Sequence, residues 1–303
     1  MSVPQIRKAS RKRAKLRLGI SAPSGAGKTM GALLLAYGIT GNWDKVGMID
    51  TEEGSGELYV GVEKHGLEIG EFQYIRISKD FSPVHYVDAV KAFENAGVEV
   101  IIIDSLTHAW AGTEGLLDKQ GKVAAKSGNS YTAWRDVTPQ HNALVNSMLQ
   151  SKCHIIATMR SKVEYAMQDG DNGKKKVVKL GMAPIQREGM EYEFTAFFEV
   201  DSSSIASPSK DRTDLFSTLN AAGTLEKRSF VITPAIGEEL LGWLNKGGEP
   251  EPSDLEKIQA LLKEVTLDPE NPQDAFLQTA DLPSLSHDKL GKILTYLTEK
   301  TNG

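Results

Sequence analysis

The sequence is poor in cysteine and has no long apolar run. Its one cysteine is Cys153, and a single thiol cannot form a disulfide within the chain. A helix that crosses a membrane needs about 20 consecutive apolar residues, and no stretch of this chain approaches that length. The first residues also lack the apolar segment of a secretory signal peptide. We therefore expect a cytoplasmic protein that has no membrane partner.

Acidic residues are absent from the start of the chain, although the net charge of the whole is -5. Residues 1–17 contain no Asp or Glu and carry a run of basic side chains: Arg7, Lys8, Arg11, Lys12, Arg13, Lys15 and Arg17. Such a run can contact nucleic acid, because each neutralised phosphate releases counterions. It can equally be a solvated tail. Both interpretations stay open.

Extremes of composition are absent as well. With 40% hydrophobic and 25% charged residues, the chain has the composition of an ordinary globular protein. Its 303 residues suffice for one full α/β domain and a small appendage. Gly and Pro gather at residues 246–253 (KGGEPEPS), which is typical of a linker. We expect a basic arm at 1–15, a core at 16–245, the linker at 246–253 and a small helical domain at 254–303.

Short β-rich apolar runs alternate with helical patterns in the expected core. The runs lie at residues 16–21, 46–50, 72–77, 98–104 and 153–159, and the helical patterns lie at 28–39, 83–95 and 131–149. Strands of this kind that alternate with helices form a mainly parallel sheet covered on both faces. The predicted fold class is therefore α/β, with a doubly wound core.

Three further segments complete the expected organisation. Residues 163–180 predict a β-hairpin that projects as a flap, because two strand-like runs flank the turn DGDNG at 169–173. Residues 191–201 predict another strand, and residues 230–244 predict a closing strand and helix. Beyond the linker, apolar residues at helical spacing predict a small C-terminal helical unit.

A glycine-rich loop joins the first expected strand to the first expected helix. Residues 21–29 (SAPSGAGKT) fit the GxxxxGK[ST] pattern of a P-loop, except that Ala22 replaces its first glycine. Gly25 and Gly27 let backbone N–H groups turn inward on phosphates, and the helix adds its positive dipole end. We predict that ATP is bound by Ser24, Gly25, Ala26, Gly27, Lys28 and Thr29. Lys28 would bridge the β- and γ-phosphates, and Thr29 would bind Mg²⁺.

A carboxylate on the metal side of the site should follow a buried strand. Asp104 ends the apolar run at 98–103, so we predict it as the Walker-B acid that binds Mg²⁺ with Thr29. Ser105 follows, so this chain lacks the Asp-Glu pair that supplies the hydrolytic glutamate in many ATPases. The carboxylate that activates water must therefore come from elsewhere. Glu52 and Glu53 follow the strand at 46–50, whose end lies near the γ-phosphate side of the loop.

The motif Asp50-Thr51-Glu52 resembles a feature of the RecA and RadA recombinases. These proteins end the strand after the P-loop helix in a similar Asp-x-Glu, whose glutamate polarises the attacking water. By this resemblance Glu52 is the expected catalytic base, with Glu53 as its substitute. The alternative is that both are ordinary loop acids.

More narrowly, the chain is similar to RecA-like ATPases that bacteriophages carry in recombination and replication modules, a family related to phage single-strand annealing proteins. The matching features are the basic lead-in at 8–15, APSGAGKT at 22–29, IIIDSLTHAW at 101–110, QREGMEYEF at 186–194 and TPAIGEELLGWL at 233–244. The resemblance spans about residues 8–244. It implies a RecA-like ATPase core, a homo-oligomeric ring or filament, single-stranded DNA as a partner, and a place in the bacterial host cytoplasm.

Two weaker site candidates follow from this resemblance. Thr158 ends the strand expected beside the Walker-B strand, where RecA-like proteins place a polar residue that senses the γ-phosphate. The neighbouring Arg160 is interpreted as a surface cation. In oligomeric RecA-like ATPases a cation from the next subunit completes the site, and such charge stabilisation accelerates hydrolysis strongly. Arg187 is the first candidate for that cation, ahead of Lys179 and Lys176.

The expected flap carries a group of lysines near Tyr165, namely Lys174, Lys175, Lys176 and Lys179. This composition suits contact with a nucleic-acid backbone, and it is also common on hairpins that must stay soluble. The leading function is a Mg²⁺-dependent ATPase that acts on single-stranded DNA in annealing, strand exchange or replication. The alternative is a partner-loading ATPase that meets a single-stranded-DNA-binding protein or another replication protein. A small-molecule P-loop kinase ranks third, because the hairpin is rich in Lys and not in Arg.

Overall fold

The computed structural model describes most of the chain in two compact units. It describes residues 14–169, 175–219 and 224–245, and in the C-terminal part 258–259, 261–262, 265, 267–269, 271–280, 282 and 287–302. The basic residues before Ala14, Lys174 and the expected linker lie outside the described residues, as do the side chains of the flap lysines and Tyr165. One unit spans Lys15–Leu244, and the other contains Asn245–Gly303. The predicted domain boundaries themselves stay predictions.

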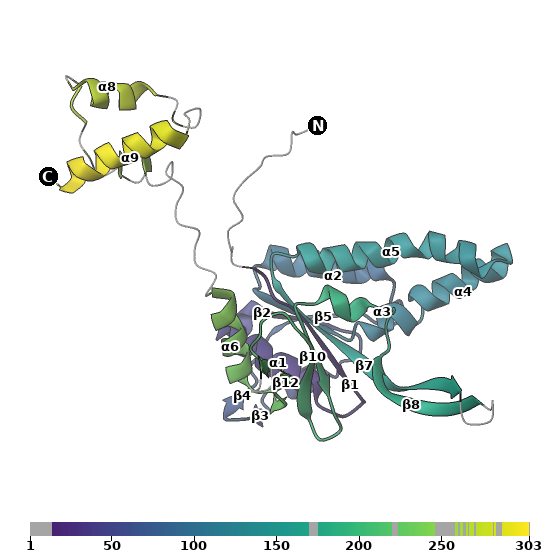
Figure 1. The fold of residues 1–303 in the computed structure, drawn as a ribbon. Helices are drawn as coiled ribbons and strands as arrows, with labels where there is room; N and C mark the ends of the chain where they lie inside the picture. Colours follow the sequence, from purple (N-terminus) through teal and green to yellow (C-terminus); the bar gives the residue numbers. More distant parts are fainter. Residues whose placement is uncertain are drawn as a thin grey trace. The chain divides into compact units, whose positions relative to one another are not determined.

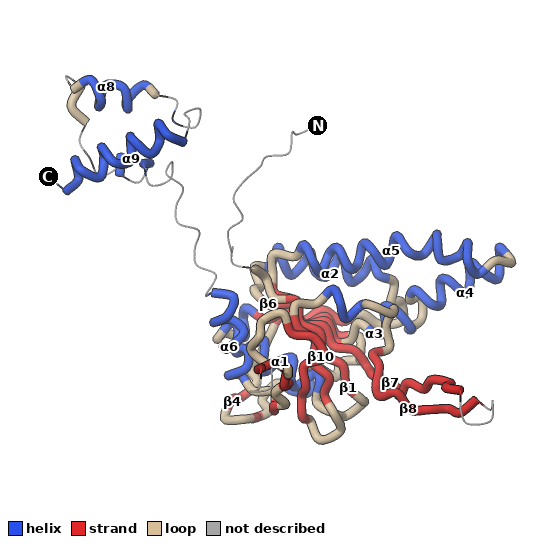
Figure 2. The backbone as a smooth tube through the Cα atoms, viewed as in Figure 1, coloured by secondary structure: helices blue, strands red, loops and turns tan. Residues whose placement is uncertain are grey.

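A nine-stranded sheet forms the centre of the large unit (Figure 1, Figure 2). The strand order is β13-β10-β9-β1-β7-β6-β2-β5, and β8 pairs with β7 outside this path. The parallel strands are β1 (Arg17–Ala22), β2 (Val46–Asp50), β5 (Gln73–Arg76), β6 (Val100–Asp104), β7 (His154–Asp169) and β9 (Ala196–Val200). At one edge β10 (Ile205–Asp211) and β13 (Phe230–Val231) run antiparallel. The prediction of an α/β fold with a mainly parallel sheet is therefore confirmed.

Helices cover both faces of this sheet. One core contains residues of α1 (Lys28–Thr40) and α6 (Pro234–Asn245), and the other contains residues of α2 (Pro83–Ala96) and α5 (Ser130–Gln150). Successive side chains of β6 point to opposite faces of the sheet. Ile102 packs in the first core, while Ile101 and Ile103 pack in the second. Burial on both sides is why these runs are continuously apolar, as expected for parallel strands.

Shorter elements lie around this framework. They are α3 (Thr107–Ala111), α4 (Leu116–Ser127), η1 (Trp43–Lys45), η2 (Glu57–Tyr59), η3 (Met190–Glu193), β3 (Glu63–Lys64), β4 (Leu67–Glu68), β11 (Ser217–Leu219) and β12 (Leu225–Lys227). Sequence patterns predicted neither α4 nor β10. The strand expected from residue 191 begins only at Ala196, because η3 takes up the preceding residues.

The flap is a direct extension of a core strand. A strand at 153–159 and a hairpin at 163–180 were expected separately, but β7 is continuous through both. It pairs antiparallel with β8 (Lys175–Pro184), from Ser161 opposite Pro184 to Asp169 opposite Lys175. Figure 1 shows the pair extending beyond the body of the sheet. The predicted hairpin is confirmed, and the continuous strand β7 connects it to the centre of the sheet.

The structure corrects the role expected for Arg17. This residue belongs to β1 and is buried, so it is not part of a solvated basic arm. Its guanidinium donates hydrogen bonds to the carbonyl oxygens of Leu149, Ser151 and Cys153 at 3.0, 2.5 and 2.7 Å. These carbonyls lie where α5 ends and the chain turns into β7. Arg17 therefore satisfies buried backbone acceptors and is unavailable to nucleic acid.

The C-terminal unit is helical, as the sequence predicts. It contains α8 (Pro272–Thr279) and α9 (His287–Asn302). Its small core includes Ile258, Leu277 and Leu297. Among the described residues, no helix combines the length and the apolar character that a membrane span requires.

Helices α1 and α6 approach each other through two glycines. A Cβ atom placed on Gly237 would lie 2.5 Å from the carbonyl oxygen of Leu35, and one on Gly38 would lie 2.0 Å from that of Pro234. Real Cβ atoms cannot occupy such positions without movement of the backbone. Only glycine at both positions allows α6 to cover α1 this closely.

We predict that Gly237→Ala destabilises the protein by about 1 to 3 kcal/mol, the range for overpacking a core. Urea denaturation followed by circular dichroism measures this free energy of unfolding. Gly242→Ala on the same helix is the matched control, because a Cβ there meets nothing within 4 Å. It should stabilise the helix by about 0.5 to 1 kcal/mol. Equal effects of the two substitutions would contradict the proposed close contact.

Candidate functional site

The P-loop lies between β1 and α1, as predicted. Gly25 and Gly27 have φ angles of 81° and 88°, a conformation that L side chains rarely adopt. Gly27 is also the N-cap of α1, where it supplies no side-chain hydrogen bond, and the first turn holds no acidic residue. The N–H groups of this turn have no acceptor within the helix. The loop and helix therefore present unsatisfied donors and a positive dipole end, which suits a phosphate group.

The predicted phosphate and metal residues meet at the carboxyl ends of the strands. Lys28 is buried, and the Thr29 hydroxyl donates a hydrogen bond of 2.5 Å to Asp104 Oδ2. Thr158 donates to the other oxygen, Oδ1. Burial raises the pKa of Asp104, and the hydrogen bonds from the two threonines oppose that rise. Two hydroxyls thus orient a fully buried carboxylate.

Strand order explains this convergence. β7 lies between β1 and β6, so Thr158 stands opposite Ile20 on one side, while its neighbour Ala157 stands opposite Ile103 on the other. Thr158 is therefore level with the start of the P-loop and with Asp104. The structure places its hydroxyl on Asp104, and its expected role as a γ-phosphate sensor stays a prediction.

The loop after β2 is shaped by Asp50. Its carboxylate accepts hydrogen bonds from the backbone N–H groups of Glu52 and Gly56, at 2.5 and 2.8 Å, and from the Tyr74 hydroxyl at 2.7 Å. Two of these donors belong to the loop and the third to β5, so Asp50 acts as a structural group that ties the loop to the sheet. The following Thr51 donates its N–H to the Asp104 carbonyl at 2.7 Å. These bonds fix the direction of Glu52.

Glu52 forms a two-point ion pair with Arg160. Arg160 Nε donates to Oε1 at 2.9 Å and Nη2 donates to Oε2 at 2.7 Å. Burial would raise the pKa of Glu52, but the hydrogen bonds and charge of Arg160 outweigh it, so the pKa is lowered. The positive charge of Lys28 acts in the same direction, and so does His108 when it is protonated, although burial lowers the pKa of His108. Arg160 was expected to be a surface cation, and its pairing with Glu52, which lies 108 residues away in the chain, was not predicted.

Glu53 faces away from this cluster. It adopts a φ of 60° and pairs with Arg76. Its side chain is 71% exposed, whereas that of Glu52 is 18% exposed. Of the two glutamates, Glu52 lies within electrostatic reach of Lys28 and Asp104. Its role as the catalytic base stays a prediction.

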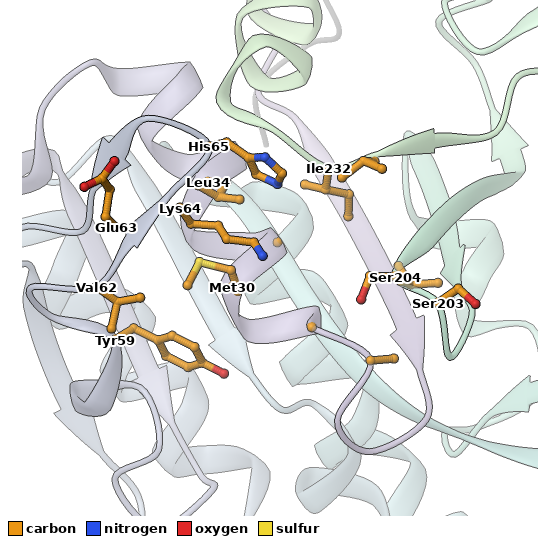
Figure 3. Close-up of a pocket in the computed structure, with 15 residues that line it drawn as sticks. Met30, Leu34, Tyr59, Val62, Glu63, Lys64, His65, Ser203, Ser204 and Ile232 are labelled. Atoms are coloured by element: carbon orange, nitrogen blue, oxygen red, sulfur yellow. The ribbon is translucent and has the colours of Figure 1, made fainter.

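A cavity of about 700 Å³ lies beside the P-loop. Figure 3 shows Lys64 and His65 of the β3–β4 hairpin on one side, Ser203 and Ser204 on the other, and Met30 of α1 between them. Ala26 and Gly27 also line the cavity, so it is continuous with the phosphate loop. No sequence motif indicated this cavity, because its walls come from four segments that are distant in the chain.

Tyr59 of η2 lies between this cavity and the metal side of the site. Burial raises the pKa of its hydroxyl, and the negative charges of Asp104 and Glu52 add to the rise, while a hydrogen bond with Thr29 opposes it. The phenol therefore remains a neutral hydrogen-bonding group near the predicted Mg²⁺ ligands. No sequence motif indicated this tyrosine.

Arg187 lies in a cavity whose described lining contains none of the P-loop residues. Its Nη1 atom is 3.4 Å from His141 Nδ1, and it lines a second cavity of about 700 Å³ with Trp110, Trp134 and Tyr192. The two tryptophan rings are stacked, with centroids 5.6 Å apart and planes inclined by 20°. A role for Arg187 in the site of a neighbouring subunit stays a prediction.

The donor set fits Mg²⁺ in a nucleotide complex. Within the described ranges no three His, Cys, Asp or Glu side chains gather into a metal cluster. One hydroxyl, from Thr29, and one carboxylate, from Asp104, are present. Mg²⁺ is commonly held in this way, by a few protein oxygens together with phosphate oxygens and waters.

Comparison with known proteins bears on the same region. A family model described as an AAA domain matches residues 14–222. No curated protein matches the sequence. The matched residues make up more than half of the chain and contain the P-loop, Glu52, Asp104 and Arg160. The chain therefore belongs to the AAA domain family of P-loop proteins, whose members are generally ATPases.

Proposed function

We propose that this chain binds ATP with Mg²⁺ and hydrolyses it at the P-loop. The observation that supports this most directly is the meeting of Lys28, Thr29, Asp104 and Glu52 at the N-terminus of α1. This set contains a phosphate-binding cation, two metal-binding oxygens and a carboxylate to accept a proton. Each is a requirement of phosphoryl transfer to water.

Each residue has a definite task in this proposal. Lys28 and the N–H groups after Gly25 bind the β- and γ-phosphates. Thr29 and Asp104 hold Mg²⁺, which when bound neutralises charge on the phosphate oxygens. Glu52 orients a water molecule and accepts its proton. The nucleoside occupies the adjoining cavity, where Met30 and Ile232 offer apolar contacts and the serines at 203 and 204 offer hydroxyls.

Lys28→Ala should lower ATP affinity about 10- to 100-fold, the loss expected for hydrogen bonds to a charged group. Titration with a fluorescent ATP analogue measures the affinity. Lys45→Ala serves as the control, because Lys45 pairs with Glu99 and its side chain is 43% exposed. Unchanged binding by Lys28→Ala would exclude the P-loop as the nucleotide site.

Glu52→Gln should preserve ATP binding and lower turnover by about 10²-fold or more, because an amide cannot accept the proton of water. Steady-state phosphate release measures turnover. Glu53→Gln changes the neighbouring exposed carboxylate in the same way and should leave turnover nearly unchanged. The assignment of the base is wrong by one residue if the two variants behave in the opposite manner.

We further propose that single-stranded DNA is the partner of this ATPase, in annealing or strand exchange within a bacteriophage recombination or replication module. The second cavity supports this, because stacked Trp110 and Trp134, with exposed Tyr192, offer ring faces to unpaired bases. The second cavity is also connected to the proposed ATP site. Trp110 follows Asp104 closely in the chain, and the Gln186 amide donates to the Leu106 carbonyl at 3.1 Å.

A partner-loading ATPase remains the alternative function. The C-terminal unit has an apolar cavity of about 260 Å³, lined by residues that include Leu277, Ile293 and Tyr296. Such a cavity suits an apolar side chain of a replication protein, for example a single-stranded-DNA-binding protein. Either function is compatible with a homo-oligomer in which Arg187 reaches the neighbouring site.

Trp134→Ala should weaken binding of single-stranded DNA by about 1 to 3 kcal/mol, the usual value for loss of one stacked base. Fluorescence anisotropy with a labelled oligonucleotide, in ATP and Mg²⁺ at low salt, measures the change. Tyr131→Ala is the control, because Tyr131 is 88% exposed on the same helix and does not line the cavity.

The salt dependence separates stacking from charge. Trp134→Ala should leave the slope of log affinity against log salt unchanged, whereas joint neutralisation of Lys174, Lys175 and Lys176 should lower it. Absence of DNA binding by the unaltered protein would reject the DNA proposal and favour the partner-loading function.

A further inference from the structure

The ion pair between Glu52 and Arg160 occupies both oxygens of the candidate base. A carboxylate in this state is a poor proton acceptor, because each oxygen already accepts a hydrogen bond from a cation. Lys28 of α1 also faces Glu52 and disfavours its protonation. His108 of α3 acts in the same direction only when it is protonated, and burial lowers its pKa. Asp104 of β6 is a negative neighbour of Glu52. Hydrolysis therefore requires that this pair open.

The backbone at Arg160 is fixed, but its side chain can reorient. Arg160 N–H donates to the Thr107 hydroxyl at 2.9 Å, and its carbonyl accepts from the N–H of Ile185 at 2.7 Å. The residue stands opposite Ala22, the first residue of the phosphate-loop pattern, in the pairing of β1 with β7. Its side chain is 41% exposed. The guanidinium thus extends from a rigid point beside the P-loop.

A terminal phosphate would compete directly with Glu52 for this guanidinium. The negative charge of Asp104 already acts on Arg160, which places the cation within electrostatic reach of the predicted metal side. A γ-phosphate carries more charge than a carboxylate and accepts the same two-point hydrogen bonds. ADP lacks this group and would leave the ion pair in place.

We propose that Arg160 is a positioning residue that exchanges Glu52 for the γ-phosphate when a nucleoside triphosphate occupies the P-loop. The released Glu52 then orients water. The oxygen of that water forms a bond to the γ-phosphorus, its proton passes to Glu52, and the bond to the β,γ-bridging oxygen breaks to leave ADP and phosphate. The inference rests on the proposed ATP site and adds a control on when the base is free.

The test measures the affinities of the full chain for ADP and for the non-hydrolysable analogue AMP-PNP, both with Mg²⁺. Glu52→Gln removes the competitor, so it should favour AMP-PNP over ADP by about 2- to 5-fold, the value of a partly exposed ion pair. Arg160→Gln should lower the AMP-PNP preference, and Arg160→Lys should restore part of it, because Lys keeps the charge but not the two-point geometry.

A double-mutant cycle separates exchange from simple charge repulsion. In the Arg160→Gln background, Glu52→Gln should no longer increase the AMP-PNP preference. Glu53→Gln and Arg76→Gln change a matched ion pair one residue along the loop, and neither should alter the preference.

The pH profile adds a second measurement, since loss of Arg160 raises the pKa of Glu52 and moves the acid limb of kcat/KM to higher pH.

Equal effects of Glu52→Gln on the AMP-PNP preference with and without Arg160 would overturn the exchange. An Arg160→Gln variant that keeps the AMP-PNP preference and the pH profile of the unaltered protein would overturn it as well. Failure of the unaltered chain to bind either nucleotide would instead reject the proposed ATP site.

Discussion

Much of the candidate site depends on one buried carboxylate. Asp104 is fully enclosed at the end of β6, and the hydroxyls of Thr29 and Thr158 each hold one of its oxygens. These two hydroxyls come from α1 and β7, so the carboxylate joins the P-loop helix to the strand that continues into the flap. A buried anion without such donors would be costly. The same contacts keep the two predicted metal-binding oxygens together.

Positive and negative side chains both surround the P-loop, and together they leave a site that suits an anion. Lys28 and Arg160 provide positive charge, while Asp104 and Glu52 provide negative charge nearby. Arg160 and Glu52 satisfy each other, whereas the first turn of α1 has neither a side-chain cap nor an acidic residue of its own. Bound phosphate would satisfy the N–H donors of this turn and shift the balance of the ion pair. In the proposed mechanism, nucleotide binding would thus be connected with release of Glu52 through electrostatics.

The two proposed binding regions are linked by the segment after Asp104. This segment contains Leu106, whose carbonyl accepts the Gln186 amide, and Trp110, which lines the second cavity. Its backbone is also anchored to β7, because Leu106 N–H donates to the Thr158 carbonyl at 2.9 Å. A ligand at the stacked tryptophans would thus act on residues adjacent to the metal side. Under the DNA-binding proposal, this short hydrogen-bonded segment is where a bound strand would meet the ATP site.

The sequence by itself determined the elements whose signals are local. Continuous apolar runs predicted the buried parallel strands, and the pattern around Gly25 and Lys28 predicted the P-loop at a strand-to-helix junction, because backbone conformation and burial there follow from neighbouring residues. Tertiary structure decided which acid faces the site and which cation it meets. Glu52 and Glu53 are adjacent in sequence, and only the loop conformation, with Glu53 at a φ of 60°, turns them to different partners. Arg160 and Arg17 were misjudged for the same reason: the partners of a side chain distant in sequence depend on strand order and register.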